Sequence, residues 1–152
     1  MTHALKTLLD HAERERDEGL ALLRQAENAE AQLRLQAEQL HLYRNEYDAR
    51  HPARGGRAAP IELLRCHLGF MQRLQQAQTQ QLGQLEAVAA RVQRQRQAVV
   101  ALELRVASVR KLLERRGHDQ RRASDRLEQR RHDEAAQQRA WRDRAELHAA
   151  AG

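Results

Sequence analysis

The chain has 152 residues, of which 32% are charged and 3% aromatic, with arginine, glutamine, leucine, alanine and glutamate dominating. This composition argues against a thick globular core and is typical of long helices and coiled coils. No apolar run reaches the ~18 residues that a membrane-spanning helix needs, and no signal-peptide core follows Met1, so we expect a cytoplasmic protein.

The net charge of +6 is unevenly distributed along the chain. Residues 1–49 carry a net charge of −4, residues 50–111 of +8 and residues 112–152 of +2. An acidic third and a basic third in one chain favour a fold in which the two face each other.

The first predicted helix covers about residues 3–50 and has an apolar stripe with alternating spacings of four and three. Charged side chains interrupt this stripe at Arg16, Glu30 and Arg44. Its apolar or small members are Leu5, Leu9, Ala12, Gly19, Leu23, Ala26, Leu33, Ala37, Leu40 and Tyr47. Such a stripe predicts a helix that packs along one face.

The strongest break in the sequence lies between His51 and Pro60, where two prolines bracket the pair Gly55-Gly56. Pro52 disfavours helix at His51, and Pro60 suits the first turn of a new helix. We therefore predict a loop over about residues 51–60 and a second helix over about 60–147, within a single coiled-coil domain of residues 1–152.

The second predicted helix follows a heptad repeat. Its a positions are Leu64, Met71, Gln78, Leu85, Val92, Val99, Val106 and Leu113. Its d positions are His67, Leu74, Gln81, Val88, Gln95, Leu102 and Val109. Sustained heptads favour a coiled coil, and beyond Leu113 the repeat decays. The lone Cys66 precedes the first d position, has no disulfide or metal-binding companion, and is expected to be half-buried.

These elements predict an all-α fold in which two long helices form an antiparallel coiled-coil hairpin with a longer second helix. At 1.5 Å per residue the helices are about 70 Å and about 130 Å long. Residues that face each other across the hairpin should have numbers that add to about 110. The N-terminal end of the first helix therefore lies opposite roughly residue 107. A parallel homodimer through the second helix is the alternative, but it would align arginine-rich segments with their own copies.

The sequence contains no phosphate loop, nucleophile elbow or Cys/His cluster at metal spacing, so we expect no enzyme activity, cofactor or metal. The basic charge leaves two alternatives open, namely nucleic-acid binding and a basic coiled-coil adaptor. Acidic residues interleave with the arginines after residue 113, and no stacking aromatics accompany them, which disfavours nucleic acid.

Two segments are candidates for partner binding. The region after about Lys111 has scattered Leu127, Trp141 and Leu147 and no intrachain partner, so it either frays or is covered by another protein. Phe70 lies at the edge of the seam and either forms an exposed docking site or folds over the seam. We expect Phe70→Ala to leave helicity and melting nearly unchanged, whereas a large drop in melting temperature would make Phe70 a core residue.

Three segments resemble the FliJ family of flagellar export proteins, which includes stalk proteins of type III secretion injectisomes. Tyr43-Arg-Asn-Glu-Tyr47 resembles the Tyr-x-Asn-Glu-Tyr segment of the family, and Phe70-x-x-x-Leu74-x-x-Ala77 resembles its Phe-x-x-x-Leu-x-x-Ala segment. The stretch Asp125–Arg139 resembles its charged C-terminal helix. The resemblance in the order and spacing of these segments extends over nearly the whole chain.

The resemblance implies a non-enzymatic stalk that inserts into the hexameric flagellar export ATPase, links it to the transmembrane export gate and contacts export chaperones. It implies a cytoplasmic protein peripherally associated with the inner membrane at the flagellar base, needed for motility and chemotaxis; an injectisome stalk is the alternative within the family. The export-gate contacts would be Phe70, Leu74 and Ala77, with Gln81 where the family pattern has histidine. The predicted ATPase-ring contacts are Arg115, Arg122, Arg126, Arg130 and Arg131.

Overall fold

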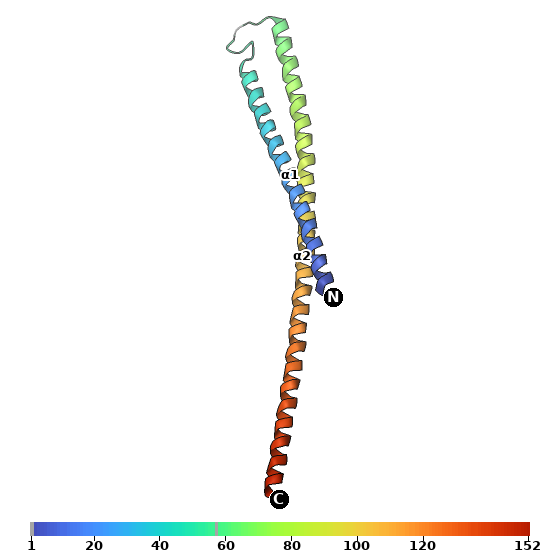
Figure 1. The fold of residues 1–152 in the computed structure, drawn as a ribbon. Helices are drawn as coiled ribbons and strands as arrows, with labels where there is room; N and C mark the ends of the chain where they lie inside the picture. The colour runs from blue at the N-terminus through green and yellow to red at the C-terminus, as the bar shows by residue number, and fades with distance from the viewer. Residues whose placement is uncertain (1, 57) are drawn as a thin grey trace. The chain divides into compact units, whose positions relative to one another are not determined.

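The structure is a computed structural model that describes residues 2–56 and 58–152. Within these residues the chain forms two α-helices, α1 (Thr2–Ala49) and α2 (Ile61–Ala151), and no strand (Figure 1). The all-α fold with a longer second helix is therefore confirmed. Arg57 belongs to the predicted loop and lies outside the described residues.

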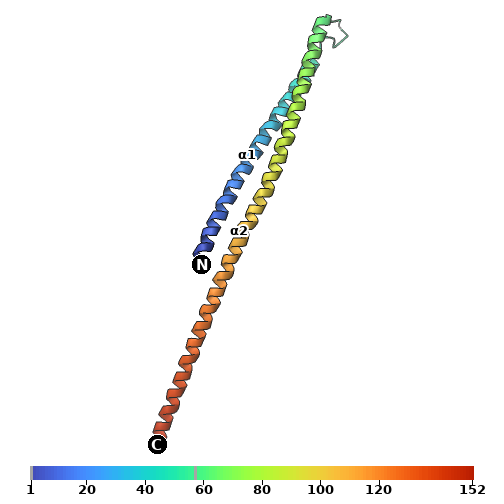
Figure 2. The same cartoon turned by 90° about the vertical axis from the view of Figure 1, so that its right-hand side faces the viewer.

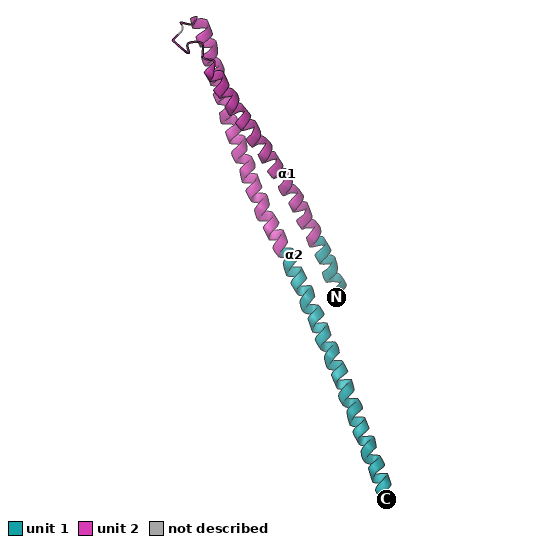
Figure 3. Ribbon diagram, turned by 90° about the vertical axis from the view of Figure 1, so that its left-hand side faces the viewer, with its two compact units in different colours: residues 1–11, 105–152 teal, residues 12–104 magenta. Residues whose placement is uncertain are grey.

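The chain divides into two compact units, each containing part of both helices (Figure 3). One unit comprises residues 12–104, which include most of α1, the connecting loop and the first half of α2. The other comprises residues 1–11 and 105–152, which bring the start of α1 together with the remainder of α2.

Within residues 12–104 the two helices lie side by side and run in opposite directions (Figures 1 and 2). Their closest approach involves small residues of α1, because Ala12, Gly19 and Ala26 are all buried. A Cβ atom added to Gly19 would lie 2.8 Å from Leu102 Cδ1 and 3.6 Å from Val99 Cγ2. The small side chains thus allow the α1 backbone to approach the larger residues of α2.

The structure buries or half-buries the residues that were predicted to form the seam. Every predicted member of the α1 stripe is buried or half-buried, including the charged Arg16, Glu30 and Arg44. All predicted a and d positions of α2 up to Leu113 are likewise buried or half-buried. Val92, at 2% exposure, is the largest side chain that is almost completely enclosed. The hydrophobic spacing in the sequence therefore identified the packing faces of both helices.

The predicted register was wrong by about ten residues. Gly19 approaches Leu102, and Arg44 bonds to Gln78, so partner numbers add to about 120 and not 110. The reason lies at the loop: Ile61 and Leu63 in the first turn of α2 are 64% and 53% exposed, and α1 meets α2 further along, where Tyr47 stacks on His67.

The connecting loop is shaped by its prolines and glycines. Gly55 and Gly56 have φ angles of +83° and +75°, a backbone conformation that residues with a Cβ atom rarely adopt. Pro60 immediately precedes α2, and its carbonyl oxygen accepts bonds from the Leu63 and Leu64 amides at 3.1 and 3.2 Å. Pro60 is thus the N-cap residue, and α2 begins at Ile61, one residue later than predicted.

In the second unit, packing is confined to the first part of its α2 segment. Val106 and Val109 are 2% and 5% exposed, and Leu113 and Gly117 are half-buried. From His118 to Gly152 every residue is exposed, although the helix continues to Ala151. We call residues 118–152 the C-terminal arm.

Glycines inside α2 offer a direct test of the helix. Nothing lies within 4 Å of a Cβ atom added to Gly83, so Gly83→Ala should raise the free energy of unfolding by about 1 kcal/mol through helix propensity. Gly55→Ala, at φ +83°, should lower it by about 1 kcal/mol. Urea denaturation followed by circular dichroism measures both, and equal shifts would contradict the assigned helix and loop.

Candidate interaction surfaces

Five rings gather where α1, the loop and α2 meet, and we call them the aromatic cluster: Tyr43, Tyr47, His51, His67 and Phe70. The Phe70 ring lies 4.4 Å from Tyr47 and 6.4 Å from Tyr43, centroid to centroid. His67 stacks on Tyr47 at 4.9 Å and meets His51 edge-on at 4.6 Å. The two sequence motifs on either side of the loop thus form one packed cluster.

The polar residues of the seam near this cluster are only partly satisfied. Arg44 Nη1 donates to Gln78 Oε1 at 2.7 Å, which pairs two polar seam positions across the helices. His67 Nε2 and Gln81 Oε1 are buried and have no hydrogen-bond partner among the described residues. Because unpaired buried polar atoms destabilise a fold, this end of the seam is its weakest part.

The predicted export-gate residues do not form one exposed surface. Phe70, Ala77 and Gln81 are half-buried, whereas Leu74 is 7% exposed and belongs to the seam. Leu74 therefore packs in the seam, and only Phe70, Ala77 and Gln81 keep exposed area that a partner could contact. Of the two orientations considered for Phe70, the structure has the ring packed against tyrosines. Cys66, expected to be half-buried, is exposed.

The position of Phe70 changes the expected effect of its removal. We expect Phe70→Ala to lower the free energy of unfolding by about 1–2 kcal/mol, since half-buried ring contacts with Tyr43 and Tyr47 are lost. Leu68→Ala is the matched control, because Leu68 is 61% exposed on the same helix. Thermal melting of both variants gives the comparison, and equal melting temperatures would contradict the packed position of Phe70.

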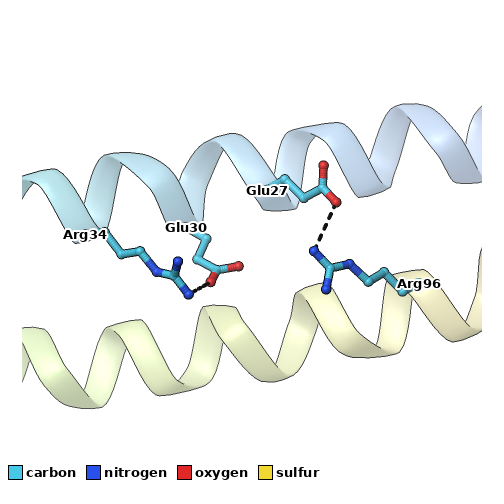
Figure 4. Close-up of polar contacts among 4 residues, drawn as sticks. All are labelled: Glu27, Glu30, Arg34 and Arg96. Atoms are coloured by element: carbon cyan, nitrogen blue, oxygen red, sulfur yellow. Dashed lines mark hydrogen bonds and ion pairs between the residues drawn. The ribbon is translucent and has the colours of Figure 1, made fainter.

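A shallow groove between the two helices carries the charge pairing predicted from the sequence (Figure 4). Arg96 of α2 reaches Glu27 of α1 at 3.5 Å, and Glu30 pairs with Arg34 on the same helix. The side chains of Glu27 and Arg96 are 42% and 53% exposed, so the pair contributes at most about 1 kcal/mol. Such a pair selects the register more than it stabilises the hairpin.

The predicted ATPase-ring residues all lie on exposed helix. Arg115 lies just before the C-terminal arm, in the same compact unit, and Arg122, Arg126, Arg130 and Arg131 lie within the arm. At about 100° per residue, the first four share one side of the helix and Arg131 lies elsewhere. The largest apolar side chain of the arm is Trp141, which is 77% exposed.

Sequence reasoning missed Arg142 and Arg144, which are exposed beside Trp141. Their position relative to Trp141 follows from helical periodicity, so a helical-wheel projection of the arm would have found them.

The described residues, 2–56 and 58–152, bring no three His, Cys, Asp or Glu side chains together as a group that could hold a metal ion. In the same part of the chain, neither helix has a stretch that is both apolar and long enough for a bilayer crossing.

The fold and its exposed arm define an antiparallel coiled-coil protein whose surfaces suit binding to other proteins. A family model described as "Flagellar FliJ protein" matches residues 1–145. The chain therefore belongs to the flagellar FliJ family, whose members are components of the flagellar export apparatus. No curated protein and no solved structure matches the chain.

Proposed function

We propose that this protein is a non-enzymatic stalk of the flagellar type III export apparatus. In this function it inserts into the hexameric export ATPase, links the ATPase to the transmembrane export gate and contacts export chaperones. It acts in the cytoplasm, peripheral to the inner membrane. The observation that carries the proposal is the C-terminal arm, a helix exposed over residues 118–152 in a chain of the FliJ family. The family match favours the flagellar system over the injectisome.

A physical argument supports an effect of the stalk on catalysis by the ring. A single asymmetric helix inside a ring of six subunits cannot contact all of them equally. It therefore binds one subunit conformation better than another, and such a difference in affinity shifts the populations of the subunits. The stalk thereby biases which nucleotide site closes.

The direct test adds the purified full chain to its cognate export ATPase and follows hexamer formation by sedimentation and ATP turnover by phosphate release. We expect both to increase in proportion to added chain until the ring is saturated. A ring whose assembly and turnover stay at their basal values would remove the proposal.

The export-gate contact has a separate test. Phe70→Ala should weaken binding to the cytoplasmic domain of the gate by about tenfold or more, because aromatic residues at interface centres carry most of the affinity. The measurement is made well below the melting temperature of the variant, with Leu68→Ala as control. Equal affinities for the two variants would place the gate contact elsewhere on the chain.

A further inference from the structure

The C-terminal arm is two-sided, although its sequence reads as mixed charge. At about 100° per residue, four of its apolar residues, Ala123, Leu127, Trp141 and Ala145, fall within a sector of about 40°. We call this sector the Trp141 face. All four residues are exposed, Leu127 by 51% and Trp141 by 77%. A large aromatic side chain left this open in the free protein is available to fill a recess in a partner.

Arginines flank the Trp141 face on both sides. Within about 80° of its centre lie Arg126, Arg130 and Arg144 on one side and Arg131 and Arg142 on the other. None of these five makes a hydrogen bond or an ion pair within residues 2–56 and 58–152. Their guanidinium groups are therefore free to bind carboxylates in two-pronged pairs.

Four of the seven acidic residues of the arm lie on the opposite side, whereas Asp119 and Glu134 lie within about 60° of the centre of the Trp141 face. Asp125, Glu128, Asp143 and Glu146 are at least about 120° from the centre of the Trp141 face. Asp133, to one side, lies 3.5 Å from the Gln129 amide nitrogen. The arm thus presents one side with five arginines around the Trp141 face and an opposite side on which four acids are mixed with Arg121, Arg122 and Arg139.

We infer that the Trp141 face is the side of the arm that binds the export ATPase, and that its site there is an apolar recess bordered by carboxylates. This inference rests on the proposed function and specifies its interface. Charge complementarity carries it: five unpaired arginines surround the exposed tryptophan, while four of the seven acids of the arm lie on the opposite side.

A membrane surface would also attract arginines around an apolar stripe. The arm is a poor match for lipid because Glu134 lies within the Trp141 face and lines a hollow beside Trp141 together with Gln137, Gln138 and Arg142. A protein site can supply a hydrogen-bond donor to this carboxylate, whereas an anionic bilayer repels it. The two apolar anchors, Leu127 and Trp141, are also about 21 Å apart along the helix, which leaves little continuous apolar area for insertion.

The test uses the full chain labelled with a fluorophore at Cys66, which is the only cysteine and is exposed in the other unit. Anisotropy titrations measure its affinity for the cognate export ATPase and for vesicles of phosphatidylglycerol and phosphatidylcholine. We expect Trp141→Ala and the pair Arg126→Gln/Arg144→Gln each to weaken ATPase binding by about tenfold or more.

Two matched controls test whether binding depends on the Trp141 face or only on the overall composition of the arm. Leu147→Ala removes a 70% exposed apolar side chain that lies off the Trp141 face, and Arg121→Gln/Arg139→Gln removes two charges from the opposite side. Both should leave the affinity within about twofold. Circular dichroism checks that helix content is unchanged in all four variants.

The outcomes distinguish the two proposals. If the labelled wild-type chain binds the ATPase and the controls weaken binding as much as the Trp141-face variants, the inference fails while the proposed function stands. Tighter binding to vesicles than to the ATPase, dependent on Trp141, would assign the face to the membrane and overturn the inference. No ATPase binding by the wild-type chain would overturn both.

Discussion

Val99→Asp is expected to destabilise the hairpin of residues 12–104 strongly. Val99 is 5% exposed and lies next to Gly19, at one of the closest approaches between α1 and α2. A carboxylate placed there loses its hydration, which is costly for a charge inside a helix–helix seam. We expect the free energy of unfolding to fall by about 4 kcal/mol and the melting temperature by about 10 °C or more. Circular dichroism at 222 nm during heating measures the effect.

The next residue in the chain provides the control. Val100 is 56% exposed, so Val100→Asp introduces the same charge and the same loss of helix propensity at the surface. Its expected effect is within about 0.5 kcal/mol. If the two variants melted together, Val99 would not lie in a helix–helix seam and the hairpin itself would be disproved.

The seam was predictable because burial in a two-helix protein depends on spacing alone. Leucine, valine, alanine and glycine at alternating intervals of four and three fix which side of each helix is covered, whatever lies opposite. For the same reason the polar members of the stripe could be placed, and Arg44 and Gln78 do meet across the seam. A helix face is thus a local property, readable from one segment at a time.

The register was not predictable by the same means. It depends on where α2 begins relative to the end of α1, and hence on how the residues between Arg50 and Pro60 turn. Two glycines at positive φ and a proline before α2 allow several loop paths, and the sequence alone does not choose among them. The heptad pattern also fits a shift of seven residues almost as well, because the same residue types recur at that interval.

The site was predictable in part. The two motifs around the loop were identified separately, and neither showed that Phe70 would pack between Tyr43 and Tyr47. This contact depends on the register, which the sequence left undetermined. The C-terminal arm was identified from the decay of the heptads, since a helix without a partner stripe has nothing to cover it. Its two-sided arrangement of charge was overlooked because the arginines and acids alternate along the sequence.

Removal of residues 118–152 is expected to abolish the effect on the export ATPase while leaving the hairpin intact. Every residue of the arm is exposed, so a chain ending at Gly117 loses no buried apolar contact. Its melting temperature should stay within about 2 °C of the full chain, because surface changes contribute little to stability. Turnover of the cognate ATPase with this shortened chain should remain at the basal rate.

The shortened chain also decides between two origins of any activation. If the hairpin surface, with the paired charges of Glu27, Glu30, Arg34 and Arg96 in its groove, were the ring contact, the chain ending at Gly117 would still stimulate turnover. If the arm is the contact, activation should return when the full chain replaces the shortened one and should fall again when excess arm peptide competes. Competition by the arm peptide requires only that it fold on the ring, since an isolated helix of this composition is marginal in water.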